Sequence, residues 1–148
     1  NKTVPPQPTL TGSPGLPSQG MPLGGTRYTH PMLVFAMARV LSTAGAKRIR
    51  FVESAWASGG PLEEYMLDSG WNARALLNLA PGIEVENTNN LGKGKKYSRF
   101  KVPGGGYIYP AYDLNQAFED TEVFRSMAKL KNHERWGVTL SRKNGIGK

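Results

Sequence analysis

The segment from Lys129 to Asn144 holds a dense group of side chains that can bind an anion. Lys129, Lys131 and His133 occupy alternate positions after a predicted strand, so they can project together from one edge. Lysines supply positive charge, and threonine and asparagine supply neutral hydrogen bonds. The further residues of these kinds are Thr139, Lys143 and Asn144. This composition predicts a site for a phosphate or a carboxylate, with His133 as a catalytic candidate.

Glu53 is the second catalytic candidate. It is the first acidic residue of the chain and ends an alternating stretch that predicts a strand. Ligands of open α/β sheets gather beyond the carboxyl ends of the strands. A carboxylate there can act as a base, bind a cation or hold a basic side chain. A plain salt bridge within basic surroundings is an equally good interpretation.

Thr29 and His30 form a third candidate site, at the start of a predicted helix. Gly24-Gly25 precede them, and Pro31 follows in the first turn. Backbone N–H groups and the helix dipole at such a place suit an anion, and histidine adds a proton donor or acceptor. The alternative is that Thr29 only caps the helix and His30 has no chemical role.

Charge and composition narrow the class of partner. The chain has 148 residues, 19 basic and 11 acidic, with a net charge of +8 and a basic run at 93–101. This favours an anionic small molecule or an acidic protein surface, with nucleic acid less favoured; a solvated basic face is the alternative. The chain has no cysteine, so it holds no iron–sulfur cluster. Its two histidines lack metal-ligand spacing, and no apolar run is long enough to span a membrane.

The elements expected to position these residues follow a helix–strand rhythm. Residues 1–28 are rich in proline and glycine and predict an irregular arm, and residues 29–148 predict one domain. The pattern predicts a helix from the N-cap Thr29 to Gly45 and a strand over Lys47–Glu53, followed by a break at Gly59-Gly60-Pro61. After the break it predicts helices over Leu62–Leu67 and Asn72–Leu79 and a strand over Ile83–Asn87. We therefore expect an α/β fold with a mainly parallel sheet flanked by helices, in Rossmann-like layers.

The second half of the chain predicts an inserted β-hairpin and a last helix. Lys95–Tyr109 has the pattern of a hairpin, with Gly104-Gly105-Gly106 at its tip rather than in a nucleotide-binding loop. Thr121–Met127 predicts a strand, and Arg135–Lys143 predicts a helix. A helix there would place Thr139 and Lys143 on one face.

Three stretches resemble one protein family. Lys129-Leu130-Lys131-Asn132-His133, Gly137-Val138-Thr139-Leu140 and Lys143-Asn144-Gly145 resemble the signature of the domain-of-unknown-function family 362. Thr29-His30-Pro31 and the residues 44–54 resemble its first helix and following strand, so the resemblance spans about residues 26–145. Ala128 and Asn132 depart from the family's usual proline and threonine.

The resemblance implies an α/β fold but no established reaction. Some relatives are associated with separate ferredoxin-type iron–sulfur modules, which implies an iron–sulfur partner for this cysteine-free chain. Relatives often carry export signals, so both an exported and a cytoplasmic origin stay open, with the exported one favoured. Many relatives continue beyond the motif, which leaves open that the domain is C-terminally incomplete.

Two functional hypotheses follow. The leading one is an anion-binding α/β domain, enzymatic and linked to redox chemistry, that acts on a phosphate- or carboxylate-bearing ligand with an unidentified cofactor. The alternative is a non-catalytic binding or extracellular assembly module that uses its basic surface or its N-terminal arm, including assembly as a homo-oligomer.

Overall fold

The computed structural model describes residues 2–10, 20–21, 24–54, 62–89, 91–133, 135 and 137–145; the predicted break at Gly59-Gly60-Pro61 lies outside them. Its elements in chain order are β1 (Thr3–Val4), β2 (Pro6–Pro8), α1 (Pro31–Thr43), β3 (Arg48–Glu53), α2 (Leu62–Asp68), α3 (Ala73–Leu77), β4 (Ile83–Asn87), β5 (Tyr97–Lys101), β6 (Ala111–Asn115), the 3-10 helix η1 (Gln116–Phe118), β7 (Arg125–Met127), β8 (Lys131–His133), β9 (Gly137–Thr139) and α4 (Ser141–Asn144).

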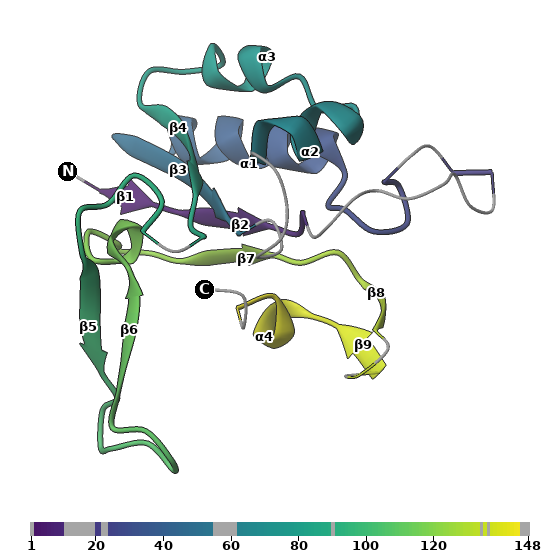
Figure 1. Ribbon diagram of the computed structural model, residues 1–148. Coiled ribbons are helices and arrows are strands. Elements are labelled where there is room, and N and C mark those ends of the chain that lie inside the picture. Colours follow the sequence, from purple (N-terminus) through teal and green to yellow (C-terminus); the bar gives the residue numbers. More distant parts are fainter. Residues whose placement is uncertain are drawn as a thin grey trace.

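The parallel strands form the centre of the fold. A three-stranded sheet has the order β1-β3-β4, and β2 pairs in parallel with β7. Because β2 also lies against β3, the strands β7, β2, β3 and β4 run side by side in one direction (Figure 1). Their carboxyl ends therefore meet at one edge, where Glu53 of β3 lies opposite Asn87 of β4.

The N-terminal segment is part of this sheet, contrary to the prediction of an irregular arm. β1 and β2 are separated only by Pro5, and residues 4–10 are buried. Arg125 donates its N–H to the carbonyl of Pro5 at 3.3 Å. The backbone N–H and C=O groups of odd-numbered residues in this segment therefore point to β7. The backbone of Pro6 and Pro8 then points to β3, and a proline has no N–H to donate to that strand. The prolines therefore end the ladder with β3 after Val4 without ending the strand.

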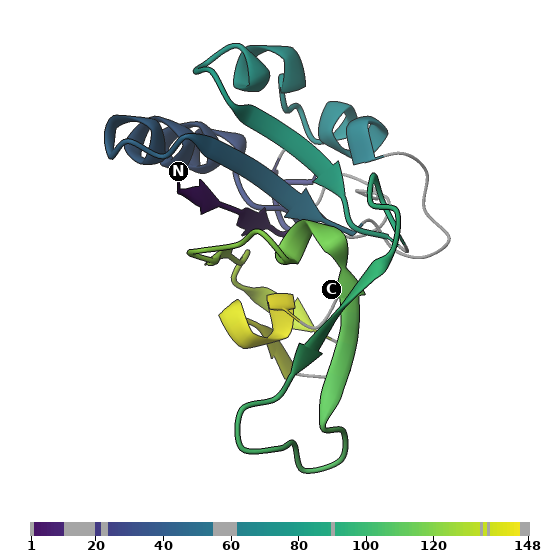
Figure 2. The same ribbon diagram turned by 90° about the vertical axis from the view of Figure 1, so that its left-hand side faces the viewer.

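The two faces of the sheet are covered differently. Helices α1, α2 and α3 lie on one face, and the β5–β6 hairpin and α4 lie on the other (Figures 1 and 2). The larger core lies under the helices and contains Val34, Phe51 and Met66, whereas a smaller core joins Val52 to Phe118 of η1. The α/β class is confirmed. The Rossmann-like arrangement with one large sheet is not, because the described strands divide into a small parallel sheet, a parallel pair and two antiparallel pairs.

Most elements of the first half agree with the prediction. α1 begins at Pro31 and is followed by Ala44 and Gly45, as the sequence signals indicated. Its N-cap is His30 rather than Thr29, because the His30 side chain accepts the N–H of Met32. No helix within the described residues is long and apolar enough to cross a membrane.

The second half differs in three places, the first of which is that β7 covers only Arg125–Met127 of the strand predicted over Thr121–Met127. The hairpin's second strand is Ala111–Asn115, not Tyr107–Tyr109, so the glycines belong to a longer loop over residues 102–110. The predicted helix over Arg135–Lys143 is wrong in its first part, where β8 and β9 pair and Lys131 lies opposite Thr139. Gly137 has a φ of +69°, which interrupts a helical path. Only Ser141–Asn144 is helical, so Thr139 and Lys143 do not share a helix face.

Candidate functional site

Glu53 is buried at the carboxyl edge of the parallel strands. Its side chain accepts the N–H of Ser54 at 2.8 Å and the N–H of Leu10 at 3.2 Å, and it also hydrogen-bonds the side chain of Gln7. Burial raises the pKa of Glu53 to about 8, although these hydrogen bonds and the charge of Lys143 act against the rise. The carboxyl group is therefore mainly protonated at neutral pH.

Lys143 and Lys131 lie near this carboxyl group, and Arg27 and Lys129 lie near Lys131. Lys131 of β8 is half-buried, and burial, followed by the charges of Lys143 and Arg27, lowers its pKa. Lys129 adds to this effect, and Glu53 opposes it. Charges that shift one another's pKa lie close together. The structure thus brings together Glu53 and the predicted lysines, and adds Arg27 from the turn before α1.

The hydroxyl of Thr29 makes hydrogen bonds within the protein at this edge of the sheet. The hydroxyl accepts the N–H of Thr9 at 2.9 Å and donates to the carbonyl of Met127 at 2.6 Å. It is also 2% exposed. Thr29 therefore joins the entrance of α1 to the ends of β2 and β7.

Asn144 fastens α4 to β2 in the same way. Its Oδ1 accepts the hydroxyl of Thr9 at 2.7 Å, and its Nδ2 donates to the carbonyl of Gln7 at 3.0 Å. Its own carbonyl accepts from Gln7 Nε2 at 2.9 Å. The side chain predicted to contact a ligand instead holds the neighbouring Lys143 in position over the edge.

Two buried polar atoms near these cations lack hydrogen-bond partners within the described residues. One is Oγ1 of Thr139, which lies opposite Lys131 across the β8–β9 pair. The other is Oε1 of Gln7, whose side chain bonds Glu53. Buried polar atoms are nearly always hydrogen-bonded, to protein or to water, so an exception suggests a position for a ligand or solvent group. A third such atom, Trp71 Nε1, belongs to a residue of the helix-side core.

The two histidines differ in their surroundings. His30 is exposed, and its Nδ1 accepts the N–H of Met32 at 3.2 Å, so it acts as a helix cap. His133 is half-buried on the same side of β8 as Lys131, and its Nδ1 accepts the N–H of Arg135 at 3.2 Å. Across the residues that the structure describes, no three histidine, aspartate or glutamate side chains gather to hold a metal ion.

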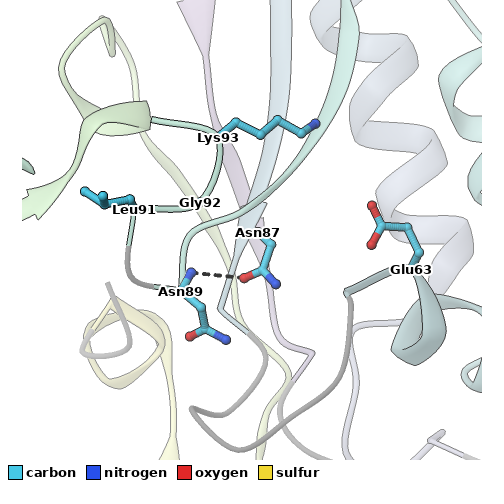
Figure 3. Close-up of a pocket in the computed structure, with 6 residues that line it drawn as sticks. All are labelled: Glu63, Asn87, Asn89, Leu91, Gly92 and Lys93. Carbon is cyan, nitrogen blue, oxygen red and sulfur yellow. Dashed lines mark hydrogen bonds between the residues drawn. The ribbon is translucent and has the colours of Figure 1, made fainter. Parts of the chain in front are cut away.

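A cavity of about 440 Å³ opens at the end of β4, on the same edge. It is lined by Glu63, Asn87, Asn89, Leu91, Gly92 and Lys93 (Figure 3). The N–H of Asn89 donates to Asn87 Oδ1 at 3.0 Å, and the backbone beyond Asn87 is tied to β3 by a bond from Thr88 N–H to the Glu53 carbonyl at 2.9 Å. The cavity therefore adjoins the strand end that carries Glu53.

A second opening, of about 270 Å³, is lined by ion-paired side chains. Arg48 and Arg50 both bond Glu84, at 2.8 Å and 3.1 Å. Because these charges neutralise one another, this opening is a weaker candidate for an anion site than the edge around Glu53.

Sequence reasoning missed Arg27 and Gln7. Arg27 lies within the Gly24–Pro31 motif, so its position beside Thr29 and His30 was an available signal. Gln7 lies among prolines that indicate a coil, and only the pairing of β2 with β7 shows that it is buried.

The sequence model of the family described as a domain of unknown function (DUF362) matches residues 19–148 of this chain. No curated protein and no solved structure matches it.

Proposed function

Because the chain belongs to the DUF362 family, its relatives supply no reaction, and on the basis of its charged edge we propose that it binds a phosphate- or carboxylate-bearing ligand. The site comprises Lys129, Lys131, Lys143 and Arg27, with Glu53 as the proton-transfer group. Its place beyond the carboxyl ends of parallel strands is the usual one for ligands of open α/β sheets.

The observation that carries this proposal is the gathering of cationic side chains beside two buried polar atoms, Gln7 Oε1 and Thr139 Oγ1, that have no hydrogen-bond partner among the described residues. The nearby carboxyl group of Glu53 has a pKa of about 8, so at pH 7 it provides little negative charge. Like charges that lie close together repel one another, and a bound anion lowers this repulsion. A phosphate or carboxylate can bond the cations, and the Thr139 hydroxyl can add a neutral hydrogen bond.

The protonated Glu53 gives the site a possible reaction as well as a ligand. An acid with a pKa close to the working pH can donate a proton to a departing or newly reduced oxygen and regain it from solvent. A redox role also requires electrons from elsewhere, because this chain has no cysteine to hold a cluster. An iron–sulfur partner chain therefore remains part of the proposal.

The test is titration calorimetry with inorganic phosphate, pyrophosphate and dicarboxylates at pH 7. We expect Lys131→Ala to weaken binding of the preferred anion by about tenfold or more, the usual effect of losing a charged hydrogen bond. Lys95→Ala is the matched control, because Lys95 is an exposed lysine of the basic run and lies outside the site. Equal affinity in the wild type and Lys131→Ala, or no binding of any of these anions, would show the proposal to be wrong.

A further inference from the structure

The outer end of the β5–β6 hairpin carries large apolar side chains into solvent. In the loop over residues 102–110, the exposed fractions of Tyr107 and Ile108 are 110% and 79%, and that of Tyr109 is 59%. Tyr112, at the start of β6, is 49% exposed. The hairpin extends away from the sheet and its helices in both ribbon views (Figures 1 and 2). A contiguous apolar group that belongs to neither core usually marks an interaction surface.

The loop that presents these side chains is well defined. The N–H of Val102 donates to the carbonyl of Pro110 at 2.9 Å and closes the base of the loop. The rings of Tyr109 and Tyr112 meet edge to face with centroids 6.1 Å apart. Gly106 lies so close to the Tyr109 carbonyl that a Cβ would collide with it. A preformed loop loses little conformational entropy when it binds.

The charge around the loop is positive. No acidic residue occurs from Lys93 to Tyr112. Lys101, the last residue of β5, is exposed beside the tip, whereas Arg99 further down the strand is paired with Asp113 at 3.0 Å. With a net charge of +8 for the whole chain, long-range attraction also favours a negative surface.

The arrangement suits an anionic lipid surface better than nucleic acid. Single-stranded nucleic acid needs cations interleaved with stacking rings, yet Lys95 and Lys96 come before β5, whose first residue lies roughly 13 Å from Lys101 by strand rise. Ile108 has no ring to stack on a base. At a lipid interface, an aliphatic residue enters the acyl region, tyrosines lie at the headgroups and a lysine meets the phosphates.

We propose that the hairpin tip, formed by Lys101, Tyr107, Ile108, Tyr109 and Tyr112, inserts into the surface of membranes that contain anionic lipids and holds the domain there. This surface is separate from the anion site around Glu53 and does not depend on it. A single short apolar tip gives weak, reversible attachment, which the positive charge of the chain strengthens.

The test is co-sedimentation with vesicles of phosphatidylcholine alone and with vesicles that also contain phosphatidylglycerol. We expect the protein to bind the second kind and the double variant Tyr107→Ser, Ile108→Ser to bind about tenfold more weakly, since an exposed aliphatic side chain no longer reaches the acyl region. Tyr97→Ser is the matched control, because Tyr97 is a similarly exposed tyrosine at the other end of β5.

A site-specific label tests insertion without relying on affinity. The chain has no cysteine, so Ile108→Cys and Tyr97→Cys can each carry one environment-sensitive dye. We expect a blue shift with anionic vesicles only from the dye at position 108. Absence of vesicle binding, binding that the tip variant leaves unchanged, or an unshifted dye at 108 would overturn the proposal, as would tip-dependent binding of a single-stranded oligonucleotide without vesicle binding.

Discussion

A carboxyl group among lysines and arginines is normally ionised, and Glu53 departs from that rule because it is almost fully buried. At 3% exposure it loses most of its hydration, and its hydrogen bonds, together with the charge of Lys143, restore only part of the lost stabilisation of the charged form. The same burial disfavours the charged form of Lys131. Glu53 and Lys131 are therefore both closer to neutrality than their types suggest, which is typical of groups that exchange protons.

The raised pKa of Glu53 predicts how stability depends on pH. The folded protein keeps the proton up to a pKa of about 8, whereas the unfolded chain releases it near 4.5, the ordinary pKa of a glutamate side chain. The contribution of Glu53 to the free energy of unfolding is thus fully present below pH 4.5, and it is lost as the pH rises from 4.5 through 8. We expect the wild type to lose roughly 1 kcal/mol per pH unit in this window relative to Glu53→Gln, measured by urea denaturation. Parallel curves for both proteins would contradict the assignment.

Type and spacing predict charged residues that the structure brings close together, but not the hydrogen bonds of two neutral residues. Strand ends and basic spacing point to Glu53, Lys131 and Lys143, and the charges of these residues act on one another in the structure. Thr29 and Asn144 have the right chemistry for a ligand. Their hydrogen bonds are instead made to backbone that is distant in sequence, such as Met127 and Gln7, and no local pattern reveals such partners.

At the scale of elements, α4 is too short to be stable alone and depends on its bonds to β2. Helices of a single turn have little intrinsic stability in water. Asn144 provides side-chain bonds to Thr9 and to the Gln7 carbonyl, both buried. The position of Lys143 over the site follows from this attachment.

We expect Asn144→Ala to destabilise the protein by about 2–4 kcal/mol, because it removes the buried hydrogen bonds of this side chain to the Thr9 hydroxyl and the Gln7 carbonyl. Chemical denaturation measures the loss. Asn132→Ala is the matched control; Asn132 is exposed on β8, so its change should stay within about 0.5 kcal/mol. Similar losses in both variants would mean that Asn144 does not brace α4.

Local signals predicted the elements of the first half well, and tertiary pairing decided the others. Pro31 and Gly45 indicate where α1 begins and ends, and the alternation of apolar and polar residues indicates β3. These signals are reliable because they act within a few residues. β2 is different, since three prolines in four residues oppose a strand, and only pairing with β7 and burial between neighbours make it one. β9 falls within the stretch that predicts a helix, because its three residues are too few to show alternation.

At the scale of the whole molecule, the N-terminal segment joins the halves of the fold. β1 pairs with β3, and β2 pairs with β7 near the other end of the chain. Leu10 belongs to the helix-side core, and its N–H holds Glu53. The family match begins at residue 19, yet β1 and β2, which precede it, lie in the centre of the sheet.

Deletion of residues 1–10 should therefore abolish cooperative folding and not merely remove an arm. The loss of β1, β2 and the Leu10 side chain exposes both the β3 edge and the β7 edge. Thermal melts followed by circular dichroism, together with amide dispersion in NMR spectra, measure the effect. A sigmoidal melt close to that of the full chain would show that the segment is dispensable.

The proline-rich strand β2 also affects how the chain reaches its native state. Gln7 and Asn144 bond across a separation of 137 positions, so β2 is synthesised long before this partner. Until then it is an unpaired strand edge, the kind that associates with other nascent chains. Pro6 and Pro8 present no N–H on one of its sides. The prolines that oppose a strand prediction for β2 thus also protect it from aggregation before it pairs with β7.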